Sequence, residues 1–246
     1  MSERTIGVIG AGVMGSGIAQ TLAQAGFNAV CCDISEEVIE KAREQVVSGR
    51  YGIDRAVQRG KLDRDAADEA LARLKFTTSL EQAARSDLVI ECVPERLDLK
   101  IRVFRDLDEL APPETVLASN TSGFSITGLA AATERPEQVI GWHWASPPPV
   151  MRLAEIVVTP ATSDETTRLI TDCAERCGKN PVVVKDLPTE WGFVGNRIYF
   201  AMIREAQRVV DSGIASTEEV NQIMVDCFNW PVGPFAMVKG ATSGWD

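Results

Sequence analysis

The fold is decided by residues 5–33, which read TIGVIGAGVMGSGIAQTLAQAGFNAVCCD. Residues 5–9 form a short apolar run of the kind that builds a buried strand. Residues 16–26 have helical spacing and end at a glycine, and residues 29–32 read as a second strand, which leads into Asp33. The order of strand, glycine turn, helix, strand and acid predicts a unit that binds a dinucleotide.

Three glycines of this stretch occupy the positions of a Gly-x-Gly-x-x-Gly turn. Gly10 permits the tight turn, Gly12 lets a pyrophosphate approach the helix N-terminus, and Gly15 permits close packing of helix on strand. Asp33 follows Gly15 by 18 residues, where a carboxylate accepts hydrogen bonds from the adenosine ribose. Because this carboxylate would repel a 2′-phosphate, we expect NAD rather than NADP. A purely structural glycine turn is the alternative, which the flanking strand, helix and acid disfavour.

Strands and helices alternate over residues 1–188. Further strands are expected at 76–78, 88–92, 115–118, 139–144, 154–158 and 182–184. Helices are expected at 35–47, 97–110 and 164–177, with a helical insertion at 53–74. This alternation predicts an α/β fold of Rossmann type with a doubly wound, mostly parallel sheet. Only helices follow, at 193–211 and 216–228, so we expect a dinucleotide-binding domain over 1–188 and a smaller all-α domain over 189–246.

His143 is the single histidine of the chain, and Glu155 follows it by twelve residues. Histidine is the usual proton-transfer residue near neutral pH. Taken alone, His143 is more simply interpreted as a ring packed between Trp142 and Trp144. However, the glycine turn, the polar loop 119–123 and His143 all fall at the carboxyl ends of predicted strands, where the ligands of such sheets bind. This placement favours a catalytic histidine.

Bulk composition disfavours several classes of function. The formal net charge of −10 argues against binding to nucleic acid or to an anionic membrane surface. We find no apolar run long enough to span a bilayer and no signal peptide before the first strand. The six cysteines form no Cys-x-x-Cys pair, and with one histidine no metal site is expected. Reduced, mostly buried cysteines indicate a cytoplasmic protein.

One basic cluster runs against the acidic net charge. The window 41–61 contains only Glu44 and Asp54 as acidic residues. Its basic residues are Lys41, Arg43, Arg50, Arg55, Arg59 and Lys61. A solvated helical surface and a site for an anionic ligand are both consistent with this pattern.

Blocks of sequence along nearly the whole chain resemble the L-3-hydroxyacyl-CoA dehydrogenases. They comprise residues 10–19, 119–122, 141–143, 149–156, 178–181 and 192–197. The resemblance implies NAD-dependent oxidation of a (3S)-3-hydroxyacyl-CoA to a 3-oxoacyl-CoA, as in fatty acid metabolism. It also implies a homodimer formed through the C-terminal helices. The family's helical domain normally runs on further, so we expect this chain to be truncated or naturally short.

The resemblance also implies roles for particular residues. His143 would be the general base, oriented by Glu155, while Ser122 and Asn196 would hydrogen-bond the substrate oxygen. The residues expected at the cofactor are Gly10, Gly12, Met14, Gly15, Asp33, Glu95, Lys100, Ser122 and Ser146. The helical insertion at 53–74 resembles the family's segment that faces coenzyme A.

Two other functions stay open from the sequence. The same hydride chemistry could act on a free β-hydroxy acid or on a hydroxyacyl group bound to a carrier protein, because Ser146 and Gly123 depart from the family's usual asparagine and serine. Alternatively, the chain could bind NAD without catalysis.

Overall fold

The computed structural model describes residues 4–187, 189–190 and 192–242. The chain divides into two compact units, residues 1–193 and residues 194–246. The first unit carries every strand in the described part of the chain, and the second is helical. We describe each unit by itself.

The first unit is built on an eight-stranded sheet with the order β3-β2-β1-β4-β5-β6-β7-β8. Its strands are β1 (Thr5–Ile9), β2 (Asn28–Cys32), β3 (Leu74–Thr77), β4 (Leu88–Glu91), β5 (Val116–Ser119), β6 (Val139–Trp144), β7 (Leu153–Val158) and β8 (Asn180–Lys185). Neighbouring strands are parallel except for the antiparallel pair β6 and β7. The expected doubly wound, mostly parallel sheet is thereby confirmed. β6 and β7 can run antiparallel because a loop without a helix joins them.

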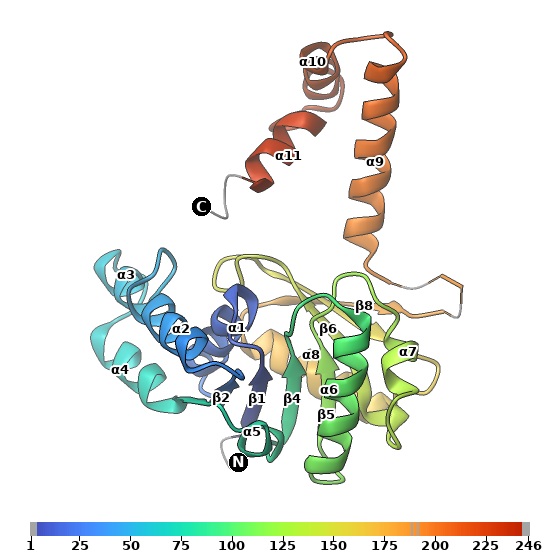
Figure 1. The fold of residues 1–246 in the computed structure, drawn as a ribbon. Helices are drawn as coiled ribbons and strands as arrows, with labels where there is room; N and C mark the ends of the chain where they lie inside the picture. The colour runs from blue at the N-terminus through green and yellow to red at the C-terminus, as the bar shows by residue number, and fades with distance from the viewer. Residues whose placement is uncertain (1–3, 188, 191, 243–246) are drawn as a thin grey trace. The chain divides into compact units, whose positions relative to one another are not determined.

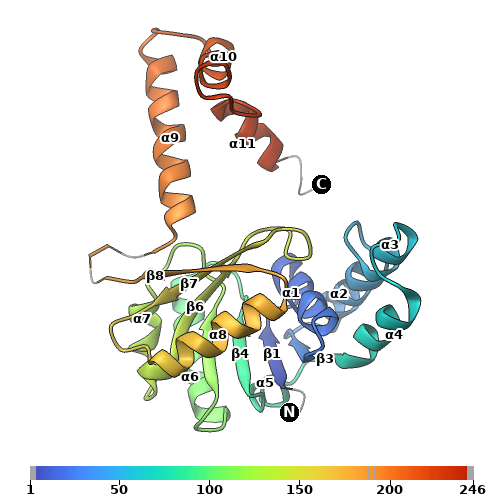
Figure 2. The same ribbon diagram turned by 180° about the vertical axis from the view of Figure 1, so that it is seen from behind.

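Helices cover both faces of this sheet, as the positions of α6 and α8 show (Figures 1 and 2). They are α1 (Val13–Gln24), α2 (Glu36–Ser48), α5 (Leu80–Ala84), α6 (Leu97–Leu110), α7 (Ile126–Ala130) and α8 (Asp164–Arg176), with a 3-10 turn at Pro136–Gln138. On one face, Ile18 of α1 and Ile170 of α8 belong to a common apolar core. On the other face, Phe104 of α6 and Leu129 of α7 belong to a second core. Burial of these apolar stripes holds the two helical layers to the sheet.

The insertion between β2 and β3 forms the two short helices expected from the sequence, α3 (Ile53–Gln58) and α4 (Arg64–Arg73). Ile53 and Ala67 pack with Ala23 of α1 in a small separate core. Asp63 caps α4, because its carboxylate accepts a hydrogen bond of 2.7 Å from the Ala66 amide. The insertion is therefore a folded part of the first unit.

The second unit contains α9 (Val194–Asp211), α10 (Thr217–Phe228) and α11 (Pro234–Thr242). Ser216 begins α10 with a capping box, in which Ser216 and Glu219 bond each other's backbone amides. Several large apolar side chains of this unit are exposed, namely Ile198, Phe200, Ile214, Ile223 and Phe228. Apart from Ile214, which lies in the turn between α9 and α10, these side chains are on the helices expected to form oligomer contacts.

Differences from the expected elements concern short segments and ends. The five-residue helix α7 was not expected, because it is too short to show helical periodicity and is defined by its Ser125 cap. Helix α11 was not expected either. The expectation of mostly buried cysteines holds for Cys31, Cys32 and Cys173, but Cys227 is exposed.

Across the described ranges, none of the helices combines the length and the apolar character that a membrane crossing requires.

Candidate active site

The glycine turn after β1 leaves open space at the start of α1. A Cβ on Gly12 would meet no atom within 4 Å, and Gly12 is the N-terminal residue of the helix with no side chain capping it. Gly10 has φ +102°, and a Cβ there would lie 2.7 Å from the carbonyl oxygen of Cys92. A Cβ on Gly15 would lie 1.7 Å from the Gly10 carbonyl oxygen. The helix N-terminus and the space beside Gly12 fit a phosphate group.

Asp33 stands directly beyond β2 and touches the same turn. Its carboxylate accepts a hydrogen bond of 2.9 Å from the Ala11 amide and a weaker one of 3.4 Å from the Ser35 amide. The acid predicted from the sequence and the glycine turn are therefore in direct contact. A carboxylate in this position fits the ribose diol of an adenosine.

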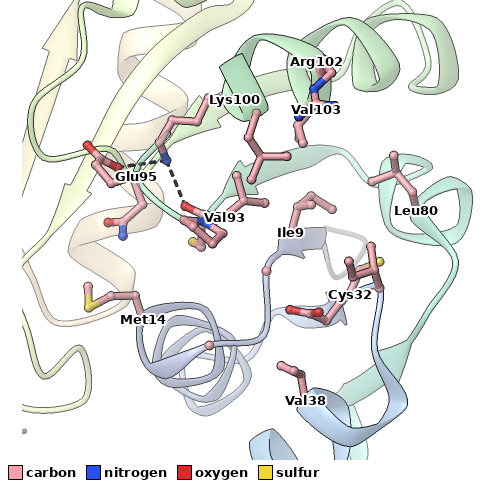
Figure 3. A pocket seen from close by; sticks show the side chains of 18 of the residues that line it. Ile9, Met14, Cys32, Val38, Leu80, Val93, Glu95, Lys100, Arg102 and Val103 are labelled. Atoms are coloured by element: carbon pink, nitrogen blue, oxygen red, sulfur yellow. Dashed lines mark hydrogen bonds and ion pairs between the residues drawn. The ribbon is translucent and has the colours of Figure 1, made fainter. Parts of the chain in front are cut away.

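A cavity of about 840 Å³ opens along the carboxyl ends of β1, β2, β4 and β5 (Figure 3). This volume is in the range of cofactor sites. The expected cofactor residues that line it are Gly10, Gly12, Met14, Asp33, Glu95, Lys100 and Ser122. Two others are not among the lining residues. Gly15 is buried beneath the turn, and Ser146 lies in the loop between β6 and β7.

Lys100 is buried in a network of acids that the sequence analysis only partly anticipated. Its Nζ lies 2.7 Å from Glu91 Oε1. It also lies 3.1 Å from Glu95 Oε2 and donates to the Val93 carbonyl at 3.2 Å (Figure 3). The Lys100 and Glu91 side chains are 1% and 0% exposed. Burial raises the pKa of Glu91, and the ammonium of Lys100 opposes that rise. The sequence analysis missed Glu91, although a charge at the end of an apolar strand is a visible signal.

The loop after β5 is tied to this network and to β6. Ser119 donates to Glu91 Oε2 at 2.6 Å, and the Ser122 amide donates to Glu95 Oε1 at 3.1 Å. The side chain of Asn120 accepts a bond of 2.9 Å from the Trp144 amide. The loop that carries Ser122 is thereby fixed between the cavity and the strand that carries His143.

His143 and Glu155 face each other across β6 and β7, whose antiparallel register pairs them directly. The distance from His143 Nδ1 to Glu155 Oε2 is 3.0 Å, and the two side chains are only 13% and 4% exposed. The ring of Phe193 stands edge-on to the imidazole at 5.4 Å between centroids. Since Nδ1 is engaged by the carboxylate, Nε2 is the nitrogen that can exchange a proton with a ligand. Phe193 was missed by the sequence analysis.

The interpretation of His143 as a ring packed between two tryptophans is wrong. Side chains alternate along a strand, so Trp142 and Trp144 point to the face opposite His143. They belong to the core that α1 and α8 cover, with 5.1 Å between their ring centroids. His143 points instead to the side of Glu155 and Phe193.

The basic cluster at 41–61 separates into two groups in space. Lys41 and Arg43 lie within salt-bridge distance of Glu37 and Glu40, at 2.7 Å and 3.7 Å. The remaining members line a cavity of about 220 Å³ beside α1 and α3, namely Arg50, Arg55, Arg59 and Lys61. This second group has the composition of an anion site.

Two further expectations concern the position of Asn196 and the binding of metal. Asn196 lies in the first turn of α9, in the second unit, so it is not part of the site described for the first unit. Within the described residues, no group of three or more histidine, cysteine or acidic side chains is arranged to hold a metal ion.

The fold and the site define a class of protein, the dehydrogenases with a Rossmann-type dinucleotide domain. The family model described as "3-hydroxyacyl-CoA dehydrogenase, NAD binding domain" matches residues 5–187. The model of that family's C-terminal domain matches residues 192–245. The chain therefore belongs to the 3-hydroxyacyl-CoA dehydrogenase family, and it is an NAD-dependent oxidoreductase.

Individual relatives agree with this assignment. A probable 3-hydroxybutyryl-CoA dehydrogenase of Deinococcus radiodurans is 42% identical over 231 residues, which cover 94% of this chain and 81% of the relative. A probable 3-hydroxybutyryl-CoA dehydrogenase of Bacillus subtilis is 40% identical, over 96% of this chain and 80% of the relative. The crystal structure of (S)-3-hydroxybutyryl-CoA dehydrogenase from Ralstonia eutropha has a TM-score of 0.90 at 41% identity, covering 96% of this chain and 81% of that one.

Proposed function

We propose that this protein oxidises the 3-hydroxyl group of (3S)-3-hydroxyacyl-CoA thioesters to a 3-oxo group. The observation that carries the proposal is the buried His143–Glu155 pair, with 3.0 Å between Nδ1 and Oε2. It stands at the end of β6, beside the loop whose Asn120 and Ser122 line the cofactor cavity. A short hydroxyacyl chain, as in 3-hydroxybutyryl-CoA, is the substrate we favour.

His143 is assigned the role of general base. Its Nε2 takes the proton of the 3-hydroxyl as the carbonyl double bond forms at C3. NAD, when bound, accepts the hydride that leaves C3. Glu155 accepts a hydrogen bond from the Nδ1–H group of the imidazole, which keeps Nε2 unprotonated before the reaction and stabilises the imidazolium afterwards. Proton, hydride and electron pair are thereby all accounted for.

Substrate and cofactor contacts are assigned from the same reasoning. Ser122 and Asn196 hydrogen-bond the substrate oxygen and orient C3. The cofactor is contacted by Gly10, Gly12, Met14, Gly15, Asp33, Glu95, Lys100, Ser122 and Ser146. For Gly15 we propose an indirect role, since it acts by letting α1 approach the turn.

The test is the appearance of NADH absorbance when the protein meets NAD and (3S)-3-hydroxybutyryl-CoA. We expect turnover by the wild-type protein and a loss on the order of 10³-fold in the His143→Gln variant. The affinity of that variant for NADH should be unchanged, because His143 does not line the cavity. Tight NADH binding without turnover on any acyl-CoA would instead support the non-catalytic alternative.

The coenzyme A moiety is assigned to the cavity lined by Arg50, Arg55 and Arg59, because an anionic ligand is favoured where basic side chains converge. We expect the Arg55→Ala/Arg59→Ala variant to raise the Michaelis constant for the CoA thioester about tenfold or more. The variant Lys41→Ala/Arg43→Ala, which alters the other half of the basic cluster, is the matched control and should not raise it.

The same pair of variants separates the substrate alternatives. If free 3-hydroxybutyrate is turned over as efficiently as the thioester, and the arginine variant affects neither, the substrate is a free β-hydroxy acid. If only a carrier-protein-bound hydroxyacyl group is turned over, the thioester assignment is wrong.

We further propose a cytoplasmic homodimer formed through the helices of residues 189–246, with residues 1–188 as the NAD-binding domain. The exposed side chains of Ile198, Phe200 and Ile223 support this proposal, since large exposed apolar groups favour association. Light scattering should give twice the mass of one chain, and Ile198→Glu/Ile223→Glu should give monomers.

A further inference from the structure

The buried network around Lys100 contains two acids and one base. Glu91 and Lys100 are almost completely inaccessible to solvent, and Glu95 is 43% exposed. Lys100 lies within 3.1 Å of both carboxylates. With all three groups ionised, this triad of Glu91, Lys100 and Glu95 carries a net charge of one negative unit.

Every neighbour of the Glu91 carboxylate is a hydrogen-bond donor. Oε1 accepts from Lys100 Nζ and from the Val93 amide, both at 2.7 Å, and Oε2 accepts from Ser119 Oγ at 2.6 Å. Ser119 Oγ itself accepts a bond of 3.1 Å from the Thr121 amide, so its own hydrogen points to Glu91. Two donors on one oxygen and one on the other, with the ammonium of Lys100 among them, match the ionised form of Glu91, which only accepts hydrogen bonds.

The triad lies along the nicotinamide half of the cofactor site. Asp33 at the end of β2 marks the adenosine side, and the glycine turn at the end of β1 marks the pyrophosphate. Beyond that turn, Glu91 ends β4, and Lys100 of α6 and Glu95 line the cavity (Figure 3). The residues in the cavity thus fit a dinucleotide extended from β2 towards β5.

The oxidised and reduced cofactors differ in charge only at the nicotinamide ring, which is cationic in NAD and neutral in NADH. A fixed negative charge near that ring stabilises the oxidised form relative to the reduced form. Adenosine and pyrophosphate are identical in both, so charges near them do not discriminate.

We propose that Glu91 is a positioning residue that holds Lys100 and supplies an excess negative charge that raises the affinity for NAD relative to that for NADH. Such a site favours capture of the oxidised cofactor and release of the reduced one. The inference concerns cofactor binding alone, so it does not depend on the acyl substrate.

The test is the ratio of the dissociation constants of NADH and NAD, measured by calorimetry on the full chain. In Glu91→Gln the triad becomes neutral, and the ratio should fall on the order of tenfold, the change for a unit charge within about 12 Å at an effective dielectric constant of about 20. Asp106→Asn removes the same charge from the same cavity, about 9 Å further along α6. Because Asp106 is exposed, solvent screens its charge, and this control should change the ratio much less than Glu91→Gln does.

If the role of Glu91 were purely structural, Glu91→Gln would lower the affinities for NAD and NADH by the same factor. That result would overturn the proposal. A double variant provides a second test, which also applies if the single variant fails to fold. Glu91→Gln/Lys100→Met removes both partners of the buried ion pair, which proteins often tolerate. Because Glu95 then remains with one negative charge, the ratio should return towards the wild-type value. A double variant that keeps the ratio of Glu91→Gln, or that falls below it, would contradict the proposal.

Discussion

At the scale of single residues, the properties of His143 depend on its partner across the strand pair. Both side chains are largely buried, and Glu155 holds the imidazole through Nδ1 at 3.0 Å. Removing one member of a buried pair leaves the other without compensation, so its effect exceeds that of a surface ion pair. Phe193 adds an apolar wall beside the ring and has φ +64°, an uncommon conformation for an aromatic residue.

The Glu155→Gln variant isolates the charge of this pair from its shape. A neutral amide stabilises the imidazolium less and permits the other tautomer, so kcat should fall on the order of 10²-fold or more. Steady-state kinetics with the CoA thioester measure this effect. The NAD dissociation constant should stay within about twofold of wild type, and an unchanged kcat would refute the role of Glu155.

Asp33→Asn tests the cofactor preference. The amide oxygen of asparagine can still accept from the Ala11 amide, as Asp33 does at 2.9 Å, so the turn should be retained. Loss of the charge weakens bonds to the ribose and removes the repulsion of a 2′-phosphate. We expect NAD affinity to fall about tenfold and NADP affinity to rise. Fluorescence titration of both cofactors measures the outcome, and equal losses for both would contradict it.

At the scale of elements, the N-terminus of α1 combines folding and binding in neighbouring glycines. Gly15 is needed for the packing of helix against turn, because a Cβ there would lie 1.7 Å from the Gly10 carbonyl oxygen. Gly12 faces open space within the protein. The two positions therefore separate the requirements of folding from those of ligand binding.

This separation predicts opposite outcomes for two alanine variants. Gly12→Ala should lower the free energy of unfolding by no more than about 1 kcal/mol, the cost of alanine at an N-cap, while weakening NAD binding at least tenfold, because its methyl group occupies the phosphate space. Gly15→Ala should lower the free energy of unfolding by about 1–3 kcal/mol. Urea unfolding and NAD titration of both variants decide the matter, and a Gly12→Ala variant destabilised as much as Gly15→Ala would be inconsistent with the open space.

The loop between β6 and β7 is held by Lys179, which precedes β8. Its Nζ donates to the carbonyl oxygens of Pro148 at 2.6 Å and Met151 at 2.8 Å, and lies 5.1 Å from the ring centroid of Trp144. Burial lowers the pKa of Lys179. The ring of Pro148 fills the space over Gly17, so the loop rests on α1.

Lys179→Met should lower the free energy of unfolding by about 1–3 kcal/mol, because two carbonyl oxygens lose their donor. Lys185→Met is the matched control, since Lys185 is exposed at the end of β8. Its effect should lie within about 0.5 kcal/mol. Urea denaturation of the two variants provides the comparison, and equal effects would show that the loop is held by packing alone.

At the scale of the whole molecule, the cysteines separate by burial. Burial raises the pKa of Cys32 and Cys173 to about 11 and that of Cys177 to about 12, and it also raises the pKa values of Cys31 and Cys92. A thiol with a pKa of about 11 is only about 0.1% thiolate at pH 8. Cys227 is the exposed cysteine of the second unit.

A disulfide reagent at pH 8 should therefore modify one thiol rapidly in the native protein. Cys227→Ser should abolish this fast phase, while all the remaining thiols should react after unfolding in guanidinium. A fast phase that survives the substitution would mean that one of the buried cysteines is accessible.

Much of the fold could be predicted from the sequence, because the information is local. Helix α6 has the bounds 97–110 that its apolar spacing predicted, and Ser35, where the helix at 35–47 was expected to begin, caps α2. The glycine turn and Asp33 could be assigned to a dinucleotide because their roles follow from chain order and spacing. Helix α7 could not be predicted, since five residues show no periodicity.

The sequence by itself determined the order of strands and helices, the NAD cofactor and the identity of the single histidine. Tertiary structure decided which side chains meet. The antiparallel register of β6 and β7 places Glu155 opposite His143 and sends the tryptophans to the other face. The tertiary structure also divides the basic cluster into two groups. It brings Glu91 into contact with Lys100 and with Ser119, which is 28 residues away in the chain. The physical reason is that such contacts depend on strand register and on distances through space, which no local pattern of residues specifies.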